Sequence, residues 1–417
     1  MSVVRDWYGT VNEGASKEIH VDSGGCSANL SFIKSEVKIV EKFKQIPPKN
    51  TATSKALVLL AFFGFVLTQP IRALTFNLTY DSSVTSQTNA AQIETAIGIA
   101  TQTIQTLYTN SSTVNVTVYW GAAGPFSGGI DLGASQTEAI GDYTYAQLTN
   151  ALNAARTTVA DSNAVASLPP SDPIAGNVWI MAEAEAKALG LSSIFGLDPN
   201  DTNSNDGAIG FASDVSYTFD STNRAVAGEF DFISVAEHEL TEVMGRDNFG
   251  LNENDLYVPY DLFRFTASGT RSFNVNDSNV YFSTDNGVSV LKDFNPNNGG
   301  DIQDWTTSTP PDSYDAYISS GVSGKLSSAD LTAVSIIGYN LNFTPPRLTG
   351  TKLANGNFKI NFTNVTGMSF VVLASTNVSL SVSNWTNLGA PTESPIGQYQ
   401  FTDTQANKMS FYRVSLP

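Results

Sequence analysis

The chain has one long apolar run, the 13 residues 56–68, which read Ala-Leu-Val-Leu-Leu-Ala-Phe-Phe-Gly-Phe-Val-Leu-Thr. A helix of that length is too short to cross a bilayer, which needs about 20 residues. Lys49 and Lys55 precede the run and the small residue Ala73 follows it. A basic flank, an apolar core and a small residue form the pattern of a secretory signal peptide. We therefore predict a protein that is secreted or held at the cell surface, with cleavage near Ala73. The alternative is a buried helix of the fold.

Residues 1–73 are accordingly interpreted as a leader, with the signal peptide near residues 49–73. The residues before it indicate a start placed too far upstream or a long N-terminal region of the signal peptide. Residues 74–417 then carry 13 basic against 33 acidic residues, a formal net charge of −20, with no cysteine and one histidine, His238. Without cysteine, stability must come from the core and from bound ions. An acidic chain without a Lys/Arg stripe is a poor nucleic-acid binder, and we expect no stable membrane span after signal cleavage.

The hydrophobic pattern of residues 74–342 predicts a mixed α+β domain. Alternating residues indicate strands at 74–80, 114–120, 178–181, 208–213 and 215–219. Helical spacing indicates helices at 90–107, 144–160, 182–188 and 331–337, and one from an N-cap at Asp231 through Val243. We expect this domain to carry the chemistry.

Residues 347–417 differ in character from the domain before them. Pro345 and Pro346 read as a linker. Short alternating runs follow, such as 358–362 and 369–373, with turn residues between them at a spacing typical of a sandwich. We predict a small all-β sandwich that folds independently and is dispensable for catalysis.

The residues best suited to chemistry lie on the helix predicted after Asp231. His238 and Glu242 are four residues apart, so they share one face of that helix. Zn²⁺ accepts both imidazole nitrogen and carboxylate oxygen, so the pair can hold one ion. Glu239 lies beside them and can polarise a metal-bound water, as in the His-Glu-x-x-His hydrolases, with Glu242 in place of the second histidine. The alternative is a surface helix with an ordinary histidine.

Residues 238–246 read His-Glu-Leu-Thr-Glu-Val-Met-Gly-Arg, which resembles the His-Glu-x-x-Glu-x-Met-Gly-Arg signature of a family of exported bacterial metalloproteases. The similarity continues through residues 261–265, 268–272, 281–287, 300–305 and 330–339, so it covers most of 176–342. It implies a metzincin-like zinc endopeptidase acting on a protein or peptide, with His238 and Glu242 as zinc ligands and Glu239 as general base. Residues 373–414 look like a C-terminal module of secreted bacterial proteins, which we expect to be fibronectin-like.

This sequence departs from the metzincin pattern at the third zinc ligand. Metzincins place it ten residues after the first histidine, where this chain has Asn248, a poor zinc ligand. The methionine turn also has no clear equivalent, because Lys325-Leu326-Ser327 stands before the last predicted helix. Asp261 is our candidate third ligand, because it belongs to the family's Asp-Leu-Phe-Arg pattern. The alternative is that Asp261 pairs with Arg264 or caps a turn.

Other chemistries lack the residues they need. Residues 74–417 have no cysteine nucleophile and no Gly-x-Ser-x-Gly elbow, and the glycine-rich residues 121–129 lack the lysine of a P-loop. Residues 201–207 imitate a calcium loop, but Ala212 at its twelfth position excludes an EF-hand. A looser Ca²⁺ site there, or at Asp301 and Asp304, stays open. The sequence thus predicts a secreted zinc metalloendopeptidase, and the alternative is an inactive protease-fold adhesin or extracellular binding protein.

Overall fold

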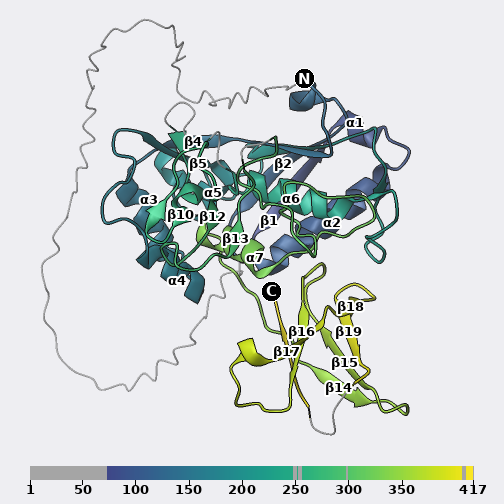
Figure 1. The fold of residues 1–417 in the computed structure, drawn as a ribbon. Coiled ribbons are helices and arrows are strands. Elements are labelled where there is room, and N and C mark those ends of the chain that lie inside the picture. Colours follow the sequence, from purple (N-terminus) through teal and green to yellow (C-terminus); the bar gives the residue numbers. More distant parts are fainter. Residues whose placement is uncertain (1–72, 248–250, 252–255, 297–298, 406–409, 417) are drawn as a thin grey trace, which may run out of the picture. The chain divides into compact units, whose positions relative to one another are not determined.

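The computed structural model describes residues 73–247, 251, 256–296, 299–405 and 410–416. The predicted leader, with its apolar run 56–68, lies outside these residues. Helices and strands alternate through the described chain, which agrees with the expected mixed α+β class (Figure 1). Among the described residues no helix is both long and apolar enough to cross a membrane.

The first sheet has the strand order β1-β2-β6-β3. Its members are β1 Thr75–Tyr80, β2 Thr113–Trp120, β6 Gly207–Phe211 and β3 Gly133–Thr137. The first three strands are parallel, and β3 runs antiparallel to β6 at one edge. Helices α2 Ala90–Leu107 and α6 Phe232–Val243 lie side by side, and α6 packs on β3 and β6 (Figure 1). The edge strand and α6 therefore form one surface.

A second sheet and several short helices follow β3 along the chain. The sheet has the order β4-β5-β9, with β4 Ala139–Tyr143, β5 Val178–Ala182 and β9 Leu256–Tyr257. The single helix predicted at 144–160 is wrong, because the chain forms α3 Tyr145–Ala154 and α4 Val159–Ala166. Thr158 ends the continuity by forming a capping box with Asp161, which starts a new helix. Helix α5 Glu183–Ala188 and η2 Ser192–Phe195 also follow β3, whereas α1 Ser82–Thr85 and η1 Gly124–Phe126 precede it.

The segment around α6 consists of short strands and long loops. Strands β7 Tyr217–Thr218 and β8 Phe230–Asp231 pair in parallel just before α6. After η3 Pro259–Phe263 comes an antiparallel sheet of β10 Arg264–Ala267, β11 Thr270–Arg271, β12 Tyr281–Phe282 and β13 Lys292–Asp293. A loop built on the buried Trp305 then leads to α7 Ser328–Ile336. This loop brings residues 301–313 beside α6.

The described part of residues 347–417 contains strands and a 3-10 helix, η4 Val382–Asn384, but no α-helix. One antiparallel sheet comprises β14 Thr349–Lys352, β15 Phe358–Thr363, β19 Gln398–Asp403 and β18 Thr392–Glu393. The other comprises β17 Thr386–Gly389, β16 Val371–Ser375 and β20 Phe411–Ser415. The two sheets touch where Phe358 stacks on Tyr412, with ring centroids 5.1 Å apart. Buried residues of this module and of residues 74–342 belong to one continuous apolar core.

Candidate metal centre

Helix α6 begins and ends where its sequence predicts. The side chain of Asp231 accepts a hydrogen bond from the backbone N–H of Ser234, so it caps the helix. Gly245 follows the last turn with φ of 109°, a conformation that favours glycine. His238 and Glu242 consequently lie one turn apart on one face, while Glu239 lies beside them.

Three side chains converge at this face of α6. His238 Nε2 lies 3.3 Å from Glu242 Oε1 and 3.3 Å from Asp304 Oδ1. The three ligand atoms lie within 4.8 Å of one another. Neighbouring ligand atoms of a tetrahedral zinc site with bonds of 2.0–2.2 Å are also about 3.3 Å apart. His238, Glu242 and Asp304 therefore have the chemistry and spacing of three ligands for one divalent cation.

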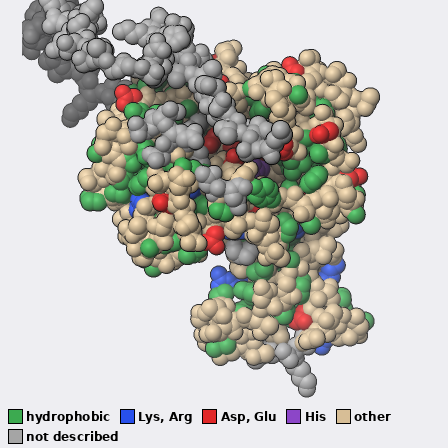
Figure 2. Space-filling model, turned by 45° about the horizontal axis from the view of Figure 1, so that its top comes forward, with side chains coloured by type: hydrophobic (Ala, Val, Ile, Leu, Met, Phe, Trp, Pro, Cys, Tyr) green, Lys and Arg blue, Asp and Glu red, His purple; other side chains and the backbone are tan. Residues whose placement is uncertain are grey.

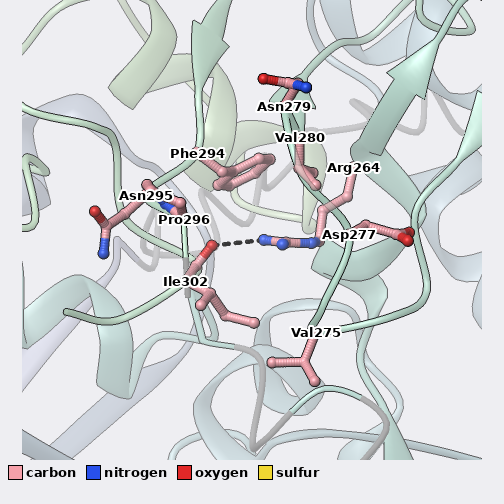
Figure 3. A pocket seen from close by; sticks show the side chains of 9 residues that line it. All are labelled: Arg264, Val275, Asp277, Asn279, Val280, Phe294, Asn295, Pro296 and Ile302. Carbon is pink, nitrogen blue, oxygen red and sulfur yellow. Dashed lines mark hydrogen bonds between the residues drawn. The ribbon is translucent and has the colours of Figure 1, made fainter. Parts of the chain in front are cut away.

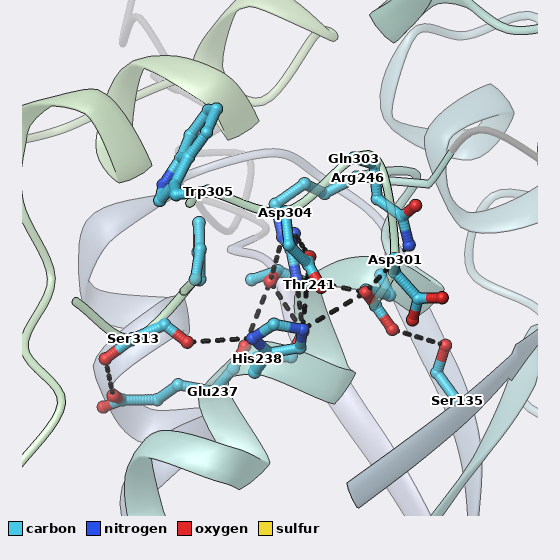
Figure 4. Close-up of polar contacts among 12 residues, drawn as sticks. Ser135, Glu237, His238, Thr241, Arg246, Asp301, Gln303, Asp304, Trp305 and Ser313 are labelled. Atoms are coloured by element: carbon cyan, nitrogen blue, oxygen red, sulfur yellow. Dashed lines mark hydrogen bonds and ion pairs between the residues drawn. The ribbon is translucent and has the colours of Figure 1, made fainter. Parts of the chain in front are cut away.

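The ring of His238 is oriented by its other nitrogen. Nδ1–H donates to the backbone carbonyl of Ser313 at 2.9 Å, so Nε2 faces the two carboxylates (Figure 4). Ser313 Oγ in turn donates to Glu237 Oε2 at 3.2 Å. A metal-binding histidine usually donates its second N–H to a carbonyl or carboxylate in this manner. Burial opposes the charged ring, but Asp304 and Glu242 raise the pKa of His238 well above its usual value.

A buried cation also contacts the two carboxylates. Arg246 Nη1 lies 2.6 Å from Asp304 Oδ1, and its Nη2 lies 3.3 Å from Glu242 Oε1. The guanidinium is fully buried and lies 4.3 Å from the ring centroid of Tyr314. Arg246 therefore supplies part of the positive charge that two buried carboxylates need.

The two glutamates of α6 differ in their surroundings. Ser135 Oγ donates to Glu242 Oε2 at 2.8 Å. Burial alone would raise the pKa of Glu242, but His238 and Arg246 lower it to about 2. Burial and the charge of Glu242 instead raise the pKa of Glu239 well above its usual range. Among the described residues Glu239 Oε2 has no hydrogen-bond partner. Glu242 is thus held in place as an anion, while Glu239 has an oxygen to spare for a ligand.

Strand β3 borders the site, and one of its edges is unpaired among the described residues. The backbone bonds Ala212 N–H to Leu132 O and Glu138 N–H to Asp206 O, at 2.9 Å each, fix its pairing with β6. Alternate residues bond to β6 in such a ladder. The N–H and C=O groups of Gly133, Ser135 and Thr137 therefore point to the open edge. A Cβ on Gly133 would collide with Glu239, so glycine lets that carboxyl lie against the strand.

Asp301 and Asp304 come from the loop before Trp305. Asp301 is exposed as a residue, yet partial burial of its carboxyl and the charge of Asp304 raise its pKa to about 8. Arg264 anchors this loop, because its Nη1 donates to the Ile302 carbonyl at 2.6 Å beside a small pocket (Figure 3). Figure 2 shows a histidine next to acidic side chains on one face of the molecule.

The structure does not bring Asp261 into this group. Asp261 is fully buried in η3, where its Oδ2 accepts a hydrogen bond from the backbone N–H of Val258 at 3.0 Å. It thus caps a turn, which was the alternative for this residue. Asp304 stands in the third position instead. The sequence offered two signals for it, the Gly300–Trp305 part of the family resemblance and the candidate Ca²⁺ site at Asp301 and Asp304, and offered none for Ser135 or Ser313.

The comparisons with known proteins identify no relative. No protein-family model matches the chain, no curated protein matches it, and no solved structure matches it.

Proposed function

We propose that the chain is an exported, zinc-dependent metalloendopeptidase. The observation that carries this proposal is the convergence of His238, Glu242 and Asp304, with the second ring nitrogen of His238 bonded to the Ser313 carbonyl. The donor set, one imidazole and two carboxylates, suits Zn²⁺ and leaves room for a further ligand. The metzincin-like family and the fibronectin-like tail follow from the sequence resemblance, and secretion follows from the signal-peptide pattern of residues 49–73; all three stay part of the proposal.

Glu239 is the residue we assign to proton transfer. A bound Zn²⁺ would polarise a peptide carbonyl and acidify a water molecule. Glu239 Oε2 is without a partner among the described residues and lies next to the ligand group, so it can take the proton from that water. The negative charge of Glu242 raises the pKa of Glu239. A cation bound in the group would offset that charge and so lower the pKa of Glu239. The carboxylate form needed for a base is thereby favoured.

The edge of β3 that has no partner in the described part of the chain supports a peptide as the substrate. A peptide in extended conformation can add to a free edge through backbone hydrogen bonds. Gly133, Ser135 and Thr137 offer such groups beside Glu239 and Glu242, as the bond from Ser135 to Glu242 demonstrates. A peptide held there would place a carbonyl close to the ligand group.

One observation favours the second candidate, an inactive protease-fold adhesin or binding protein. Arg246 contacts both candidate carboxylate ligands, so the group can close on a guanidinium instead of a metal ion. The two candidates differ in metal content.

Zinc analysis of Asp304→Asn, with Asp261→Asn as the matched control, tests the proposal. We expect wild type and Asp261→Asn to hold one zinc per chain and to cleave an unstructured protein, and Asp304→Asn to lose both properties. Zinc retained by Asp304→Asn would exclude the ligand set. A wild-type protein that binds no zinc would exclude the enzyme and leave the adhesin.

A further inference from the structure

Among the described residues, backbone hydrogen bonds join the C-terminal module to Leu326, just before α7, at one turn, residues 366–369. Leu326 N–H donates to the Gly367 carbonyl at 2.9 Å, and Ser369 N–H donates to the Leu326 carbonyl at 2.8 Å. Met368 and Phe370 are buried in the shared apolar core. The turn is therefore attached to residues 74–342 by backbone bonds and by burial.

The position of this turn is set from within the module. Glu393 accepts hydrogen bonds from Thr366 Oγ1 at 2.7 Å and from the Gly367 N–H at 3.1 Å. It also accepts from the Gly397 N–H at 2.8 Å. One carboxylate thus joins the turn to the β18–β19 hairpin, which makes the turn a rigid part of the module.

Gly367 faces the guanidinium of Arg224. A Cβ at Gly367, which has φ of 74°, would lie 2.7 Å from Arg224 Nη1. Arg224 cannot move aside freely, because its Nε lies 2.9 Å from both carboxylate oxygens of Asp231 and its Nη2 donates to the Gly324 carbonyl at 3.1 Å. Glu393 is among the charges that raise the pKa of Arg224.

Arg224 is linked to His238 through two intervening residues, Glu237 and Ser313. Its Nη2 lies 3.5 Å from Glu237 Oε2. That oxygen accepts from Ser313 Oγ, and the Ser313 carbonyl accepts from His238 Nδ1 (Figure 4). Arg224, Glu237 and Ser313 are buried and His238 is half-buried, so the contacts among the first three are not exchanged for water at low cost.

We infer that the C-terminal module helps to position the His238 side chain of the metal centre. The Gly367 turn fixes Arg224, and Arg224 orients the His238 ring through Glu237 and Ser313. These four residues are positioning residues, because none of them touches a ligand atom of the proposed metal. The inference runs against the expectation that the module is dispensable. Its consequence for zinc rests on the proposed function, whereas the ring orientation exists without metal and can be measured separately.

Two glycines of the module provide a matched pair of variants. Gly367 and Gly356 both have positive φ, 74° and 91°, so alanine is strained at either position. A Cβ at Gly356 meets nothing within 4 Å, whereas a Cβ at Gly367 meets Arg224. The backbone cost is common to both, and only Gly367→Ala disturbs the contact with Arg224.

The first measurement is solvent exchange of the His238 Nδ1–H proton, followed by nuclear magnetic resonance on the metal-free full chain. A His20→Gln background leaves His238 as the only histidine. Weakening one buried hydrogen bond should speed this exchange roughly threefold to tenfold in Gly367→Ala. Gly356→Ala should match the parent. In zinc titrations Gly367→Ala should bind about 10–100-fold more weakly, as is typical when a group that supports a ligand is altered.

Equal ring-proton exchange in Gly367→Ala and Gly356→Ala would overturn the inference. If Gly367→Ala does not fold, Ser313→Ala carries the test. It removes the link to Glu237, keeps the carbonyl that His238 contacts, and leaves the module intact. Faster exchange there supports the inference and unchanged exchange overturns it. If ring exchange responds while wild type binds no zinc, the proposed function fails and the positioning role stands.

Discussion

Substitution of Arg246 distinguishes most clearly between a structural ion pair and a metal centre. The Arg246 guanidinium lies 2.6 Å from Asp304 and 3.3 Å from Glu242, and all three side chains are buried. At an effective dielectric constant near 20, unit charges 3.3 Å apart attract by about 5 kcal/mol. Removing one partner of a buried pair costs about 3–5 kcal/mol, because the other charge is left uncompensated. We therefore expect Arg246→Met to lose about 3–5 kcal/mol of unfolding free energy when metal is removed with a chelator.

Zinc should recover much of that loss. An ion at 100 times its Kd stabilises a folded protein by about 2.7 kcal/mol. Zinc should bind Arg246→Met more tightly than wild type, because the competing positive charge is gone, so its stabilising increment should be larger. Urea unfolding followed by tryptophan fluorescence, with chelator and with zinc, gives both values. Arg271→Met is the control, since Arg271 contacts the Ser167 carbonyl and the Phe265 ring, away from the ligand group. An increment no larger in Arg246→Met than in wild type would refute the electrostatic role.

Three further variants test individual carboxyl groups. Glu239→Gln should keep zinc and lose activity by roughly 10²–10⁴-fold, because the amide cannot accept the proton; a fully active variant contradicts this assignment. Glu242→Gln should lose zinc, since a neutral amide is a weak ligand, and full zinc occupancy would show that Glu242 is not one. Burial raises the pKa of Asp261 from 3.8 to about 7. Between those values the folded state binds more protons than the unfolded state, so this residue makes stability fall as pH rises from about 4 to 7. Asp261→Asn should remove a fall of a few kcal/mol in urea titrations across that range, and parallel pH profiles would contradict the burial argument.

Local patterns predicted α6 well because its determinants are close in sequence. The N-cap Asp231 and the glycine that follows the helix, Gly245, both act within one turn of the helix. The same reasoning joined α3 and α4 into one helix, because apolar spacing continues across the break. The capping box between Thr158 and Asp161 decides that boundary, and a polar pair is easily passed over in a run of alanines.

The third candidate ligand could not be found in this way. Asp304 lies far from His238 in sequence, and its place depends on a loop that is fixed by the burial of Trp305 and by the bond from Arg264 to the Ile302 carbonyl. Asp261 has an acidic side chain and a resembling motif, but its backbone bond to Val258 turns it into a cap. Residue type and motif were equally favourable for both aspartates, so only tertiary structure separates them.

The linker between the two predicted domains is not enough to make the C-terminal module fold independently of residues 74–342. Pro345, Pro346 and the change to alternating strands mark a boundary in the sequence. They do not determine which surfaces the following module buries. A module becomes independent only if its core closes on itself. Here Met368 is fully buried, and the residue pairs with Leu326 of the preceding domain. Removing the module would expose that core and release Arg224 from Gly367, so a truncation would test stability and metal binding together. The single glycine substitution separates them, because it leaves the apolar contacts in place and alters only the turn that faces the arginine.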